Sequence, residues 1–139
     1  MPLAVLDTNV LVSALITPSG ASARLLLELR AGTFELVVSP LLLAELREVL
    51  GRKKLRRYVT TAEADAYVEF IRRDSIVLDD PAPTDAGPLS ADPEDQFLID
   101  LARAAPVDAL VSGDRHLLDL RREAPIVTPA EFLASLGDD

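Results

Sequence analysis

Four carboxylates in this sequence occupy positions from which they could act together on one ligand: Asp7, Glu45, Asp95 and Asp114. Asp7 comes directly after a short apolar run, and Asp114 follows another one after a serine and a glycine, so both lie where a buried strand would end. A charge at that place is costly unless another group compensates for it. Carboxylates that gather at one site repel one another, and a bound cation relieves that repulsion. Because the chain has no cysteine and oxygen ligands suit hard cations, the pattern predicts Mg²⁺ or Mn²⁺.

Taken singly, each carboxylate has a simpler structural explanation. Asp7 and Asp114 could cap the helices that follow them, and Asp95 could complement a helix dipole. Glu45 could be a half-exposed helix residue, although apolar neighbours flank it. Asp92 is better explained as a helix N-cap than as a ligand. The hypothesis of a metal site therefore depends on carboxylates from four distant segments reaching one end of one sheet.

The elements that would bring them there are short apolar runs alternating with longer helical patterns. Strands are predicted at 3–6, 34–39, 75–78, 109–112 and 126–127, and helices at 10–16, 23–31, 41–50, 62–73, 92–105, 116–121 and 129–136. This alternation predicts an α/β fold with three layers, α/β/α, around a central parallel sheet of about five strands. Ligands of such folds bind beyond the carboxyl ends of the strands, which is where Asp7 and Asp114 would lie.

Capping residues mark the predicted helix boundaries. Ser39, followed by a proline, is a typical N-cap, and Gly32 is a typical helix stop. Thr61 is predicted to cap the helix at 62–73, within a sequence similar to a capping box. Thr8 or Asn9 is predicted to cap the first helix.

Composition limits the class of protein. The 139 residues are 49% hydrophobic, which predicts a single folded domain over 1–139. The formal net charge of −9 argues against a non-specific DNA coat. The longest apolar runs are too short to span a membrane, and no basic region precedes the first of them, so a cytoplasmic protein is expected. A proline-rich polar connection at 79–91 is long enough to be functional or mobile.

Four motifs in order give the chain a resemblance to the PIN domain. They are LDTNVLVS at 6–13, LAEL at 43–46, DPEDQF at 92–97 and VSGDRHLL at 111–118. The sequence VTPAEFL at 127–133 also fits, so the likeness covers essentially the whole chain. The chain most resembles the VapC-like ribonucleases, which are the toxins of bacterial toxin–antitoxin systems.

The resemblance implies a function and roles for particular residues. In that family the acids matching Asp7, Glu45, Asp95 and Asp114 bind Mg²⁺ or Mn²⁺, and those matching Asn9 and Ser112 support the site by hydrogen bonds. The implied reaction is endonucleolytic hydrolysis of RNA, leaving a 5′-phosphate and a 3′-hydroxyl. The implied partners are a second copy of the chain and a cognate antitoxin. His116 departs from the pattern, because many relatives carry an acid there, and this weakens any second metal site.

Positive charge is unevenly distributed along this acidic chain. The stretch 52–57 carries five of the 14 basic residues. RNA would be drawn to the basic residues of 52–57, among them Arg52, Lys53 and Lys54, or to Arg115, Arg121 and Arg122, since the acidic site itself repels phosphate. A solvated helix end is the simpler explanation of the same stretch. Aromatic residues make up only 4% of the chain, so the composition does not indicate a platform for base stacking.

Two other functions are compatible with parts of the pattern. Asp7 could be the nucleophile of a phosphatase-like or receiver-like α/β enzyme. Such enzymes need a lysine at the site, but the only lysines are Lys53 and Lys54, and the second phosphatase aspartate would fall at Asn9. A catalytically silent PIN domain that only binds a partner is the other alternative, and the intact set of acids argues against it.

Overall fold

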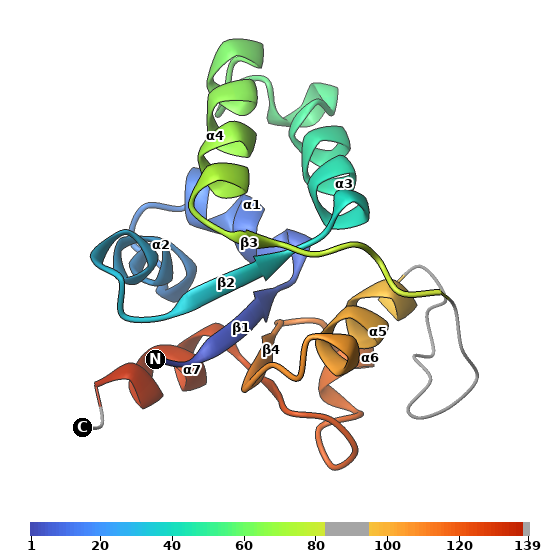
Figure 1. The fold of residues 1–139 in the computed structure, drawn as a ribbon. Coiled ribbons are helices and arrows are strands. Elements are labelled where there is room, and N and C mark those ends of the chain that lie inside the picture. Colours follow the sequence, from blue (N-terminus) through green and yellow to red (C-terminus); the bar gives the residue numbers. More distant parts are fainter. Residues whose placement is uncertain (83–94, 138–139) are drawn as a thin grey trace.

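A computed structural model describes residues 1–82 and 95–137. Within these residues five strands form one sheet in the order β3-β2-β1-β4-β5 (Figure 1). The strands are β1 (Leu3–Leu6), β2 (Glu35–Val38), β3 (Ile76–Val77), β4 (Ala109–Val111) and β5 (Ile126–Val127). All four pairings are parallel. The predicted parallel sheet of about five strands is therefore confirmed.

Helices cover both faces of this sheet. They are α1 (Thr8–Ile16), α2 (Ala21–Ala31), α3 (Pro40–Leu50), α4 (Thr61–Arg73), α5 (Gln96–Ala104), α6 (Arg115–Leu118) and α7 (Pro129–Leu136), with a 3₁₀ turn, η1, at Lys53–Leu55. Helix α5 packs on β1 and β4, and α6 packs on β5. On the other face α1 contacts α2 and α3, α7 contacts α2 and β4, and α4 packs on α3. Right-handed crossovers between parallel strands produce this three-layer arrangement.

The core lies on the three central strands. Residues 4–6 of β1, 36–38 of β2 and 109–111 of β4 are all buried. Strands of a parallel sheet are covered on both faces, which explains why these runs are continuously apolar rather than alternating. Burial of each large aliphatic side chain contributes roughly 1.5–3 kcal/mol. The edge strand β3, by contrast, is exposed.

Two of the four predicted helix caps are present. Ser39 Oγ accepts a hydrogen bond from Leu42 N, and Gly32 ends α2 with a φ of 79°, a left-handed conformation that suits glycine. Two predicted caps were wrong by one or two residues. The capping box of α4 is formed by Thr60 rather than Thr61, and α1 is capped by Asp7 rather than by Thr8 or Asn9.

Part of the prediction falls outside the described residues. Asp92 and most of the connection at 79–91 lie there, and the described part of α5 begins at Gln96. Within residues 1–82 and 95–137, no single helix is long and apolar enough to cross a membrane. Among these residues, only helices α1 and α2 taken together, bent by 94°, reach the length and apolar composition of a membrane span.

Candidate functional site

Asp7 lies at the carboxyl end of the central strand and begins helix α1. Its backbone N–H donates to Val111 O at 2.9 Å, which ties it to the neighbouring strand β4. Its Oδ2 accepts a hydrogen bond from Ser112 Oγ at 2.8 Å, and its Oδ1 accepts a long one from Asn9 N at 3.4 Å. The residue is only 4% exposed. Asp7 is thus both a helix cap and a buried carboxylate held in one orientation.

Ser112 joins the two aspartates that follow neighbouring strands. Leu6 pairs with Val111 in the sheet, so the residues after β1 and β4 emerge side by side. Ser112 is fully buried; its Oγ donates to Asp7 and accepts from Asp114 N at 2.9 Å. One hydroxyl therefore positions both the carboxylate of Asp7 and the backbone that carries Asp114.

The electrostatic state of Asp7 reflects this burial. Loss of solvent raises the pKa of Asp7 above its ordinary value, and the negative charge of Asp114 raises it further. Hydrogen bonds from Ser112 and Asn9 lower the pKa, but they offset the burial only in part. The ionised carboxylate is therefore destabilised in the folded protein unless a positive charge lies beside it.

Asp114 is the more accessible of the pair and faces a hollow. Its Oδ1 accepts a hydrogen bond from His116 N at 2.9 Å and caps the short helix α6. An open hollow of about 360 Å³ lies beside it, with Asn9 and Ser13 of α1 and Ser22 of α2 among its lining residues. His116 is exposed. Polar groups thus surround the solvent side of Asp114.

Glu45 and Asp95 lie on two different helical segments. Glu45 is half-buried in the middle of α3, and Asp95 immediately precedes α5. Among residues 1–82 and 95–137, no three or more His, Asp or Glu side chains are arranged to hold one metal ion. The structure thus brings Asp7 and Asp114 together, while the participation of Glu45 and Asp95 stays a prediction.

Two further carboxylates were missed from the sequence. Asp80 Oδ2 accepts from Leu41 N at 2.9 Å, at the start of α3 and at the same edge of the sheet. No local pattern could reveal that contact, because the partners are 39 residues apart. Asp100 is buried in α5 and accepts from Gln96 Nε2 at 3.1 Å. Asp100 interrupts the apolar run at 98–102, and that interruption is a signal that could have identified it.

The groups at this edge fit a hard divalent cation. The side-chain atoms of Asp7 and Asp114 are oxygens, the ligand type that Mg²⁺ and Mn²⁺ prefer. A cation would also stabilise the ionised form of Asp7, which burial disfavours. The hydroxyl of Thr8, next in the chain, is buried and has no hydrogen-bond partner within the described ranges. A buried hydroxyl requires a hydrogen-bond partner, and a bound water molecule would supply one.

The predicted RNA-binding residues lie at two places. Arg115 is exposed at the first position of α6, directly after Asp114. Lys53 and Lys54 form η1 at the turn between α3 and α4, and Arg52 precedes them and pairs with Glu48 at 3.4 Å. The basic stretch 52–57 thus contains a 3₁₀ turn that follows the end of α3.

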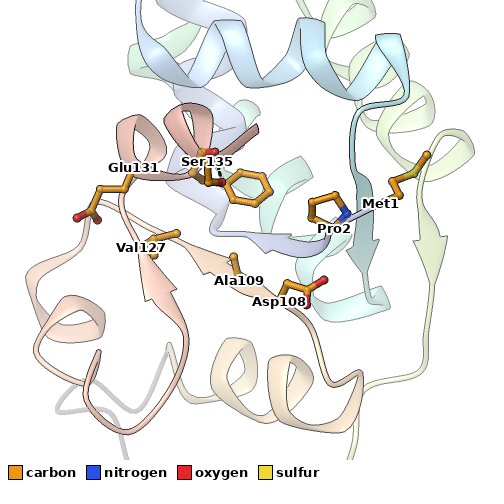
Figure 2. Close-up of a pocket in the computed structure, with 8 residues that line it drawn as sticks. Met1, Pro2, Asp108, Ala109, Val127, Glu131 and Ser135 are labelled. Carbon is orange, nitrogen blue, oxygen red and sulfur yellow. Dashed lines mark hydrogen bonds between the residues drawn. The ribbon is translucent and has the colours of Figure 1, made fainter. Parts of the chain in front are cut away.

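A second hollow, of about 560 Å³, lies between α7 and the amino ends of β1 and β4 (Figure 2). The carboxylates that line it already make hydrogen bonds or an ion pair within the protein. Asp108 Oδ2 accepts from Leu3 N at 2.8 Å, and Glu131 completes a capping box with Thr128 and pairs with Arg121. Because this hollow is at the opposite edge of the sheet from Asp7, it is not part of the candidate site.

Solved structures that share this fold include PAE2754, VapBC2 and FitAB. PAE2754 from Pyrobaculum aerophilum has a TM-score of 0.69 and 20% identity, covering 99% of this chain and 97% of that one. VapBC2 from Rickettsia felis, solved bound to a DNA fragment from its promoter, has a TM-score of 0.61 and 18% identity, covering 91% and 98%. FitAB, solved bound to an IR36 DNA fragment, has a TM-score of 0.59 and 17% identity, covering 91% and 94%.

At these identities the solved structures establish the fold alone. No curated protein matches the chain. The family model for the PIN domain matches residues 4–116, a span that contains all four predicted acids and both supporting residues. The chain therefore belongs to the PIN domain family.

Proposed function

We propose that this chain is a metal-dependent endoribonuclease that hydrolyses RNA phosphodiester bonds. The observation that carries the proposal is the buried carboxylate of Asp7, held by Ser112 beside Asp114 at the carboxyl edge of the sheet. Membership of the PIN domain family supports this activity over that of a phosphatase or receiver. Buried carboxylates with raised pKa values are typical of functional sites.

We assign the following roles to the residues of the site. The residues that would hold Mg²⁺ or Mn²⁺ are Asp7, Glu45, Asp95 and Asp114. Ser112 fixes the orientation of the Asp7 carboxylate, and Asn9 supports it from the first turn of α1. A bound divalent ion supplies Lewis-acid stabilisation of the charge that develops on the phosphoryl oxygens.

The test is cleavage of single-stranded RNA by the purified protein with Mn²⁺, compared with the Asp7→Asn variant. Asn has the same shape and can still cap α1, so we expect an intact fold. Because Asn lacks the negative charge of the carboxylate, the rate of cleavage should fall at least about 100-fold. EDTA should abolish the wild-type activity. Asp74→Asn, an exposed aspartate after α4, is the matched control and should retain activity. Equal cleavage by wild type and Asp7→Asn would refute the assignment.

We further propose that the chain is the toxin of a toxin–antitoxin pair, that it acts in the cytoplasm and that it forms a homodimer. The likeness of its fold to VapBC2 and FitAB supports this, together with the VapC-like motifs. The proposed antitoxin would cover the acidic edge that holds Asp7 and Asp114.

Expression in a bacterial host tests the toxin proposal. The wild-type chain should arrest growth, Asp7→Asn should not, and co-expression of a small protein encoded next to this gene should relieve the arrest. Light scattering of the purified chain should give twice the mass of one copy. Growth that is unaffected by an active ribonuclease would count against the toxin proposal and leave RNA processing as the function.

A further inference from the structure

Four cations form a basic turn between α3 and α4, which we define as Lys53, Lys54, Arg56 and Arg57. All four are exposed, and together they line an open hollow of about 640 Å³. In Figure 1 helices α3 and α4 stand side by side, and the turn joins the ends that lie away from the sheet. The basic turn is thus presented to solvent at one extremity of the hairpin.

Within residues 1–82 and 95–137, the carboxylates near this turn pair with other arginines and not with its four cations. Neighbouring arginines are paired: Arg47 lies 3.1 Å from Asp65, and Arg52 lies 3.4 Å from Glu48. The four members of the basic turn make no ion pair with any carboxylate in the parts of the chain that the structure describes. The protein has a net charge of −9, but the four cations create a positive potential at this turn, and that potential attracts anions.

The turn is held firmly rather than frayed. Leu55 and Val59 are buried in the core on either side of the arginines. Backbone bonds close the turn: Arg56 N donates to Lys53 O at 3.2 Å and Val59 N donates to Leu55 O at 3.0 Å. The backbone that carries the cations is therefore ordered before any ligand arrives, which reduces the entropy lost on binding.

An exposed aromatic ring adjoins the cations. Tyr58 is 51% exposed, and it is the one exposed side chain among the six aromatic residues, all of which lie in the described ranges. The Arg57 guanidinium lies over the ring, 4.9 Å from its centroid, and donates to Tyr58 Oη at 2.9 Å. The pair fixes the ring while much of its surface stays open to solvent.

We infer that the basic turn binds single-stranded RNA, with phosphates on its cations and one base stacked on Tyr58. Cations and an aromatic face are the two components of single-strand binding sites. A duplex would keep its bases stacked internally and could not use Tyr58. The inference rests on RNA being the substrate of the proposed function. It supplies the affinity for phosphate that an acidic catalytic edge cannot provide.

The first test measures binding of a labelled single-stranded RNA of about 10 nucleotides by fluorescence anisotropy, in EDTA so that no metal-dependent cleavage occurs. Lys53→Ala/Lys54→Ala should weaken binding and make the slope of log K against log salt less negative by about 1.4. Arg24→Ala/Arg30→Ala removes the same charge from exposed positions on α2 and should bind like wild type. Equal losses in both double variants would overturn the inference.

The second test isolates base stacking. Tyr58→Phe should bind RNA like wild type, because it retains a ring, whereas Tyr58→Leu should bind about tenfold more weakly. Thermal melts of both variants check that the fold is unchanged. Polyglutamate and duplex RNA serve as competitors. If polyglutamate binds as tightly as RNA, and Tyr58→Leu has no effect, the turn is a site for acidic peptides and the inference is wrong.

The inference and the proposed function fail separately in these experiments. If wild type cleaves RNA but the basic-turn variants bind it normally, only the inference fails. If RNA binding depends on the turn but no RNA is cleaved with Mn²⁺, only the proposed ribonuclease activity fails.

Discussion

At the scale of single residues, Asp7 combines two roles that usually conflict. As the cap of α1 it favours the fold, yet its burial raises the pKa of its carboxyl group above the ordinary value of 3.8. A carboxyl group with a raised folded-state pKa imposes no penalty below the unfolded pKa. The penalty grows as pH rises from the unfolded pKa to the folded pKa, and it is complete above the folded pKa. The metal-free protein therefore carries this penalty at neutral pH.

Asp7→Asn should therefore raise the melting temperature in EDTA at pH 7 by a few degrees, because it removes the penalty and retains the cap. The gain should shrink as pH falls through the folded pKa and should vanish below about pH 3.8. Thermal unfolding across this pH range is the measurement, with Asp74→Asn as the unchanged control. A lower melting temperature for Asp7→Asn at pH 7 would show that the ionised carboxylate of Asp7 does not destabilise the folded protein.

Ser112→Ala should affect stability and activity together. It leaves the buried carboxylate of Asp7 without its hydroxyl donor and Asp114 N without its acceptor, which costs about 1–3 kcal/mol of unfolding free energy. It should also raise the pKa of Asp7 further, so the acid limb of the pH–rate profile moves to higher pH. We expect a loss of activity of about 10- to 100-fold. The exposed Ser19→Ala is the control; an unshifted acid limb in Ser112→Ala would contradict the assigned role.

At the scale of elements, three helices begin where three neighbouring strands end. Asp7, Ser39 and Asp114 cap α1, α3 and α6, which follow β1, β2 and β4. The amino ends of helices carry partial positive charge, which partly offsets the gathering of carboxylates at this edge. The site is therefore a consequence of parallel strand order and not of any single motif.

The capping box of α4 offers a test at this scale. Thr60→Ala removes the acceptor for Glu63 N and should lower the free energy of unfolding by about 1 kcal/mol. Thr61→Ala, one residue further on, is the matched control and should change it by less than about 0.5 kcal/mol. Urea denaturation of both variants distinguishes the cap seen in the structure from the one predicted. A larger loss in Thr61→Ala would mean that the box is wrongly placed.

At the scale of the whole molecule, metal binding and folding should be coupled. If a divalent ion binds only the folded chain, saturating Mn²⁺ at 100 times its dissociation constant stabilises it by about 2.7 kcal/mol. The melting temperature of wild type should rise with Mn²⁺ concentration, and that of Asp7→Asn should rise far less. This readout does not depend on catalysis. Equal shifts for the two proteins would indicate that the ion binds elsewhere.

Local patterns in the sequence were sufficient for the elements and for the ends of the strands. The period of apolar residues and the capping residues depend on neighbours a few positions away, so they could be recognised without a fold. Asp7 and Asp114 were identified in this way, as were the caps at Ser39 and Gly32. The choice of Thr60 over Thr61 was also available locally, because Glu63 lies three residues after Thr60, which is the spacing of a capping box.

What the sequence determined by itself was therefore a parallel α/β chain with acids at its strand ends. Only the tertiary structure decided that β1 and β4 are neighbours, which allows Ser112 to hold Asp7 and Asp114 together. It also decided that Tyr58 is exposed beside the exposed cations of the basic turn. These outcomes depend on contacts between residues far apart in the chain, and burial and charge pairing are properties of the packed molecule rather than of any segment.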